Sequence, residues 1–178
     1  MTNKNTSNVA HAFRYGLYIT AASIVLMLIS YIFGLVNNGF IGVLSWIVIL
    51  VGLFLSAYKF REEKLNGFIS YGSAFSVIFL TGLFYGILMA PYIMLHFGLI
   101  APEVLDQMMY EVQKQIADTG QVTQEQFDAL RTYQENFTYT WWGMGIGKFL
   151  GGLLWGVIGG LLLSLIIKKE NPNRSPFN

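Results

Sequence analysis

Three long stretches of the chain contain no charged side chain. They run from Tyr15 to Tyr58, from Leu65 to Pro102 and from Phe149 to Ile167. A surface helix or strand of a water-soluble protein shows polar or charged side chains at regular intervals, and stretches this long leave no such face. The pattern therefore predicts an all-α membrane protein. It excludes an ordinary soluble enzyme, a disordered chain and a nucleic-acid binder.

Turn signals divide these stretches into four membrane-spanning helices. A helix needs about 20 residues to cross roughly 30 Å of hydrocarbon, so the first stretch must hold two helices, separated at Asn37-Asn38-Gly39. The second stretch has no comparable turn near its middle and predicts one helix with a kink near Pro91, because proline removes a backbone hydrogen bond. The Trp141-Trp142 pair, typical of a membrane interface, opens the last span. We expect spans at residues 15–36, 40–58, 68–97 and 141–167.

The basic residues predict the orientation of these spans. Charged side chains make up 12% of the chain, about half the share of a soluble domain, and eight of the basic ones fall on one side of the predicted bilayer. Because cytoplasmic segments are enriched in Lys and Arg, we expect both termini in the cytoplasm. The first span lacks the short apolar core and small-residue cleavage site of a signal peptide, so we expect it to be retained. The eight residues belong to the tail at 1–14, the loop at 59–67 and the tail at 168–178: Lys4, Arg14, Lys59, Arg61, Lys64, Lys168, Lys169 and Arg174.

The segment at residues 101–140 differs from the rest and predicts an acidic extracytoplasmic helical hairpin between spans three and four. It holds seven acidic and two basic residues. Apolar side chains recur at helical spacing from Leu105 to Ile116, and Thr123 with Gln126 has the spacing of a capping box that opens a second helix. Its apolar side chains are Phe127, Leu130, Tyr133 and Phe137.

Three roles for this hairpin remain open at the level of sequence. The two helices can fold their apolar stripes together and expose a solvated acidic face. Alternatively, the hairpin can dock a protein partner of the envelope or lie over the membrane surface, although its negative charge opposes adhesion to anionic headgroups. We expect no metal site here, because the spacing of a calcium-binding loop is absent.

Glycines are concentrated in the last span and predict close helix packing. They form two ridges of small residues with a spacing of four, which allow the backbone of a neighbouring helix to approach. The first interpretation is packing of span three on span four, and the alternatives are homo-oligomerisation through the second ridge or a helix unwound to line an ion path. The ridges are Gly143-Gly147-Gly151 and Gly152-Gly156-Gly160-Ser164, and span three offers Ala74, Gly82, Gly86 and Ala90.

Few other residues suggest chemistry. Lys148 is the one basic side chain expected at membrane depth, where a charge is a functional candidate. Its ammonium can also extend to the interface as an anchor. The glycines before Lys148 do not match a nucleotide-binding motif. With no cysteine and only His11 and His96, we expect no disulfide, no histidine metal site and no cofactor.

The organisation resembles a family of small bacterial inner-membrane proteins, the domain of unknown function 4199. The resemblance rests on Lys64-Leu-Asn-Gly-Phe-Ile-Ser-Tyr-Gly-Ser-Ala-Phe75, on Pro102-Glu103 at the start of the acidic segment and on the glycine-rich last span. It implies four helices in a bacterial inner membrane and no known activity.

We expect the protein to be a non-enzymatic accessory, scaffold or assembly factor of the bacterial envelope. Its spans would be surrounded by the lipid bilayer. The alternative is a small oligomeric transporter or channel subunit. Transport ranks second because cation-coupled carriers normally place Asp or Glu within their spans, and the three uncharged stretches contain none. An enzyme ranks third because no span carries a catalytic constellation such as Ser with His.

Overall fold

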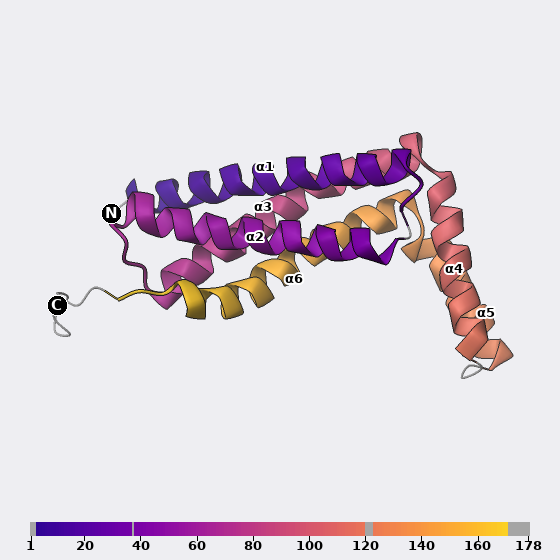
Figure 1. Cartoon of the computed structure of the whole chain (residues 1–178). Helices are drawn as coiled ribbons and strands as arrows, with labels where there is room; N and C mark the ends of the chain where they lie inside the picture. Colours follow the sequence, from indigo (N-terminus) through magenta and orange to yellow (C-terminus); the bar gives the residue numbers. More distant parts are fainter. Residues whose placement is uncertain (1–2, 37, 120–122, 171–178) are drawn as a thin grey trace. The chain divides into compact units, whose positions relative to one another are not determined.

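The chain folds into helices throughout the part that the computed structural model describes, residues 3–36, 38–119 and 123–170 (Figure 1). No strand occurs in those residues apart from one isolated antiparallel bridge, between Ile69 and Lys169. The all-α prediction is confirmed. The helices are α1 (Asn3–Ile32), α2 (Gly39–Lys64), α3 (Tyr71–Leu95), the π-helix η1 (His96–Ile100), α4 (Glu103–Thr119), α5 (Gln124–Tyr133), the π-helix η2 (Gln134–Thr138) and α6 (Trp141–Ile167).

Among the residues that the structure describes, four helices are long and apolar enough to cross a membrane, as the sequence predicted. The spans that meet this criterion are Asn8–Ile32, Gly39–Lys64, Tyr71–Ile100 and Trp141–Ile167. The chain is therefore a multi-pass membrane protein. Its helices form two compact units, one of residues 1–88 and 151–178 and the other of residues 89–150.

Two helices extend beyond the expected spans. The first was expected to follow a tail at 1–14, yet α1 begins at Asn3. The second was expected to end at Tyr58 before a loop at 59–67, yet α2 continues to Lys64 and carries Arg61 and Lys64 in its last turn. Charged residues end a membrane span but not a helix, because Lys and Arg are good helix formers and suit the negative C-terminal end of the helix dipole.

The third span keeps its hydrogen-bonded backbone past the predicted kink. Pro91 lies inside α3, which remains α-helical to Leu95. Residues His96–Ile100 then form a wider π-helix, in which the Ala101 N–H donates to the His96 carbonyl oxygen at 2.8 Å. The departure from α geometry thus begins five residues after the proline. Such π-helical turns often mark functional positions.

The end of α6 is fastened to α2 and to the connection that follows it. The Arg61 guanidinium donates to the Ile167 carbonyl oxygen at 2.9 Å. Ile69 and Lys169 exchange two backbone hydrogen bonds, each of 2.9 Å. These bonds satisfy carbonyl and amide groups that the last turn of a helix and the adjoining backbone leave without intrahelical partners.

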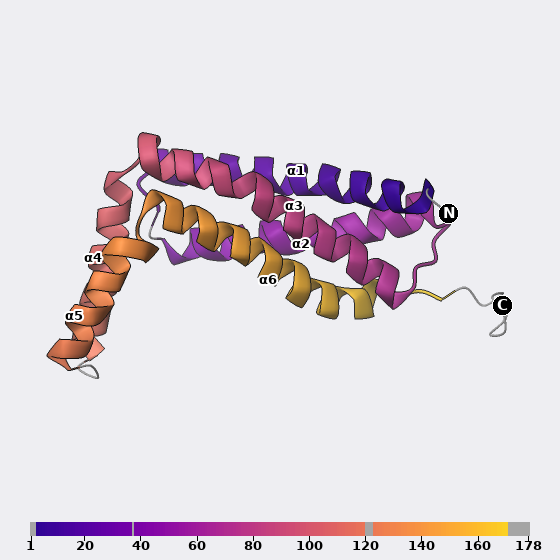
Figure 2. The ribbon, with the colours of Figure 1, turned by 180° about the vertical axis from the view of Figure 1, so that it is seen from behind.

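In the other unit, α4 and α5 lie side by side (Figures 1 and 2). Thr123 caps α5 as predicted: its hydroxyl accepts from the Gln126 N–H at 3.3 Å, and the Gln126 side chain accepts from the Thr123 N–H at 3.0 Å. The expected end of the preceding helix at Gly120 falls outside the described residues.

Candidate functional site

A buried polar cluster joins three membrane-spanning helices. His11 lies on α1, Ser56 on α2 and Thr81 on α3, and all three are almost completely shielded from solvent. The His11 Nε2 atom lies 2.9 Å from the Ser56 carbonyl oxygen. The Ser56 hydroxyl lies 2.7 Å from the Thr81 hydroxyl.

The hydrogens of this cluster can be assigned from the acceptors. A carbonyl oxygen only accepts, so Nε2 of His11 carries a proton. Thr81 donates its own hydrogen to the Val77 carbonyl oxygen at 2.8 Å, so Ser56 donates to Thr81. The imidazole thus contacts the backbone of Ser56 and not its hydroxyl, and the arrangement differs from a serine activated by histidine.

Aromatic rings complete the surroundings of His11. The imidazole stacks on Tyr15 with centroids 4.7 Å apart and meets the edge of Phe60 at 5.1 Å. Polar contacts between membrane helices hold them together. The cluster therefore links α1, α2 and α3 in one unit.

The sequence pattern predicts a tail at 1–14 and gives no role to His11. In the structure, Ala12 and Ile19 lie seven residues apart on α1 and are both buried. Seven residues is the spacing of one helix face, so the apolar residues on both sides of Arg14 were the available signal that the helix begins before Tyr15.

The second glycine ridge packs directly on α3. An ideal Cβ atom at Gly82 would lie 2.6 Å from the Gly156 Cα atom, and one at Gly152 would lie 2.6 Å from the Gly86 Cα atom. Farther along the ridge, a Cβ at Gly160 would lie 2.9 Å from the Phe75 ring. Backbone therefore meets backbone where these two helices cross, and no side chain fits between them.

The first glycine ridge has different surroundings. A Cβ at Gly143 would collide with the Phe137 carbonyl oxygen. By contrast, Gly147 and Gly151 have open space, with no atom of the described residues within 4 Å of an added Cβ. The glycines of this ridge therefore do not share one neighbouring helix.

Other glycines make close contacts that the four-residue ridges did not reveal. An ideal Cβ at Gly16 would lie 2.8 Å from the Phe84 Cβ, and one at Gly145 would lie 3.2 Å from the Ala90 carbonyl oxygen. Gly52 receives the side chain of Ile19. A single glycine can thus serve a helix crossing without belonging to a repeated pattern.

Lys148 lies on α6, two helical turns after Trp141, and is partly buried. Seven residues correspond to nearly two turns, so both side chains start from the same face of the helix, about 10 Å apart along its axis. A side chain on a helix inclines towards the N-terminal end. The side chain of Lys148 thus has the geometry that allows its ammonium to extend towards the end of α6 that begins with Trp141.

The outer surface of the 101–140 segment carries an apolar stripe on α5 and η2. Leu130, Tyr133 and Phe137 are 41%, 59% and 52% exposed, whereas Leu105 on α4 is buried. The rings of Tyr133 and Phe137 stack at 5.3 Å, and Phe137 meets the edge of Trp142 at 6.0 Å. We name Leu130, Tyr133 and Phe137 the hairpin face.

Charged groups surround the hairpin face. Glu125, Asp128 and Glu135 are all exposed. Arg131 forms an ion pair with Glu135 at 2.7 Å. This hydrogen-bonded carboxylate raises the pKa of the Arg131 guanidinium. The negative charge of the segment is therefore displayed beside the apolar stripe.

No group of three metal-ligating side chains occurs in the part of the chain that the structure describes. No curated protein and no solved structure matches the chain. One family model matches residues 14–169, which include all four spans and the segment between the third and the fourth. The chain belongs to the family described as "Protein of unknown function (DUF4199)".

Proposed function

We propose that this protein is a non-enzymatic accessory or assembly factor of the bacterial inner membrane whose 101–140 segment binds another envelope protein. The observation that carries the proposal is the exposure of the hairpin face. Two helices that only fold their own stripes together would bury these side chains, and large exposed apolar groups in a small segment mark interaction surfaces.

The charge of the segment specifies the partner further. Its seven acidic and two basic residues give a negative field beside the hairpin face. Complementary charges on two proteins increase the rate at which they associate and disfavour partners of the wrong charge. The apolar and aromatic groups supply most of the binding affinity. The partner proposed is therefore a protein with an apolar patch bordered by Lys and Arg.

Site-specific cross-linking in intact cells tests this function. The chain has no cysteine, so Leu130→Cys introduces a unique attachment point on the hairpin face. We expect one recurrent adduct of this variant with a single other envelope protein. Adding Tyr133→Glu should remove that adduct, because a buried carboxylate at the contact is costly to desolvate.

The matched control is Gln107→Cys, at an exposed position on α4 and opposite Leu105 by helical spacing. It should give no such adduct. Equal capture from both positions would show random collision, and adducts between copies of this chain alone would contradict the proposal.

The orientation in the proposal follows from the positive-inside bias. A reporter that works only in the cytoplasm should be active when fused after Asn178, whereas one that works only outside should be active when fused to a chain truncated after Asp118. Activity of an external reporter after Asn178 would contradict an even number of spans with cytoplasmic termini.

A small oligomeric transporter or channel subunit is the second candidate. The polar cluster of His11, Ser56 and Thr81 favours it, because polar side chains within spans often line pathways. The open space at Gly147 and Gly151 offers a close-approach surface for another copy. Uptake or conductance by the purified protein in liposomes, together with only self-adducts in the cross-linking experiment, would favour this candidate.

A further inference from the structure

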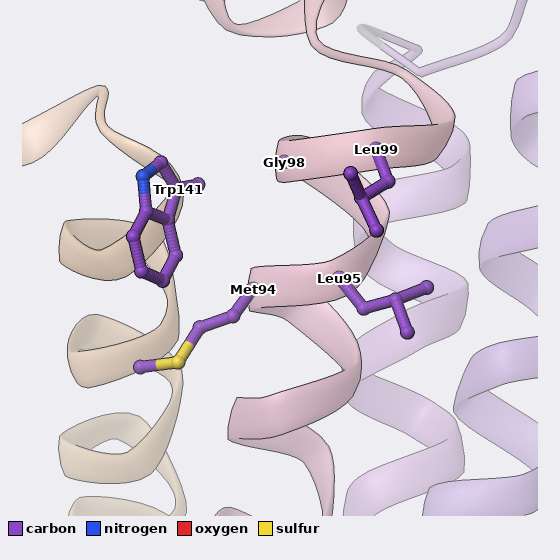
Figure 3. A pocket seen from close by; sticks show the side chains of 5 residues that line it. All are labelled: Met94, Leu95, Gly98, Leu99 and Trp141. Carbon is purple, nitrogen blue, oxygen red and sulfur yellow. The ribbon is translucent and has the colours of Figure 1, made fainter.

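An apolar pocket lies between the end of the third span and the start of the fourth. It is lined by Met94 and Leu95 of α3, Gly98 and Leu99 of η1, and Trp141 of α6 (Figure 3). Its volume of about 430 Å³ falls within the range of small-molecule sites. We propose that this pocket binds one acyl chain of a bilayer phospholipid.

The location of the pocket in the membrane-spanning helices indicates which molecules can enter it. Both walls belong to segments that qualify as membrane spans, Tyr71–Ile100 and Trp141–Ile167. The lining is open sideways, since Leu99, Trp141 and Leu95 are 80%, 52% and 49% exposed. The side of a membrane span faces lipid, so a lipid chain is what this opening contacts.

The wall of the pocket is shaped by the π-helix. Gly98 lies in η1 and has no side chain, and an ideal Cβ there would lie 3.6 Å from the Trp141 Cβ. The Met94 side chain extends towards α6 below the indole (Figure 3). The missing side chain at 98 thus leaves room beside the ring, above a floor made by Met94.

The ring of Trp141 forms one wall of the pocket. In Figure 3 its indole nitrogen lies at the end of the ring farthest from Met94, on the side away from Gly98 and Leu99. At a membrane interface the ring of such a tryptophan contacts hydrocarbon. The pocket therefore presents apolar groups to a lipid chain.

Quenching of tryptophan fluorescence by brominated phospholipid tests the site. Replacing Trp46, Trp142 and Trp155 with Phe leaves Trp141 as the single reporter. In phosphatidylglycerol–phosphatidylcholine vesicles with a minor fraction brominated near the ester, we expect several-fold stronger quenching of Trp141 than of Trp46 in the corresponding Trp46-only variant. Trp46 is an appropriate reference because its side chain is 60% exposed on α2.

Filling the pocket should abolish the excess quenching of Trp141 over Trp46. Gly98→Leu occupies the space, and Gly98→Ala is a milder change because its Cβ makes only an ordinary contact with Trp141. The matched control is Gly147→Leu, an exposed position with open space around it. Helical content measured by circular dichroism checks that each variant is folded.

The outcomes are distinct. Excess quenching that falls to the Trp46 level in Gly98→Leu, falls less in Gly98→Ala and persists in Gly147→Leu supports the lipid site. Equal quenching of Trp141 and Trp46, or an excess unaffected by Gly98→Leu, overturns it. Protection of Trp141 from brominated lipid also overturns it and points to a protein side chain as the occupant. Cross-linking at Leu130 is independent of this result, so the two proposals can fail separately.

Discussion

Replacing Gly82 with alanine is expected to destabilise the packing of α3 on α6 by about 3 kcal/mol, at the upper end of the usual cost of overpacking. The added Cβ atom would lie 2.6 Å from the Gly156 Cα atom and 2.8 Å from the Gly152 carbonyl oxygen. Both are backbone atoms that cannot rotate away, so the helices must separate. Titration of the purified protein from mild detergent into sodium dodecyl sulfate, followed by tryptophan fluorescence, measures the loss.

The matched control for this prediction is Gly151→Ala. It lies on the same helix as Gly152, with no described atom within 4 Å of an added Cβ. Alanine is the better helix former by roughly 1 kcal/mol, so this variant should be as stable as the parent or slightly more stable. Equal destabilisation by the two substitutions would contradict the crossing described here.

Replacing His11 with alanine is expected to cost about 2–3 kcal/mol, between a lost polar contact in a membrane protein and the full truncation of a buried ring. The variant loses the bond to the Ser56 carbonyl oxygen and the contacts with Tyr15 and Phe60. The same detergent titration provides the measurement.

Two comparisons separate the causes of the His11 effect. His11→Phe retains a ring but no donor and should recover part of the loss. Arg14→Ala alters an exposed neighbour and should have little effect. A His11→Ala variant as stable as Arg14→Ala would show that the cluster does not hold α1 in place.

The spans could be predicted because a bilayer excludes charge over a fixed thickness. The limits of the helices could not be predicted in the same way. The backbone remains helical beyond the membrane wherever the side chains allow it, as α1 does before Tyr15 and α2 does after Tyr58. The π-helix at His96–Ile100 likewise depends on hydrogen bonding that shifts by one residue, and no residue type marks it.

The glycine pattern shows which helix faces permit close approach, but it does not show which of them meet. Gly82 and Gly86 meet Gly152 and Gly156, while Gly147, with the same spacing, remains open. The difference arises from the angle and register of two helices far apart in sequence. His11 was missed for a related reason, since its partner is a backbone carbonyl that any residue provides.

The segment at residues 101–140 was predictable in part. The capping box at Thr123 was predictable because all of its atoms lie within four residues. The exposure of Leu130, Tyr133 and Phe137 was not predictable, because the same apolar spacing describes a stripe packed on a neighbour and a stripe left open. For this reason the sequence alone left the role of this segment undecided.

The two-way bridge between Ile69 and Lys169 also has a consequence for biosynthesis. These residues are far apart in the sequence and exchange both hydrogen bonds, and Arg61 donates to the Ile167 carbonyl oxygen beside them. Translation proceeds from the N-terminus, so α1, α2 and α3 emerge before their final partner exists. These hydrogen bonds can form only after α6 has been inserted. Their presence therefore indicates that all four spans have been assembled.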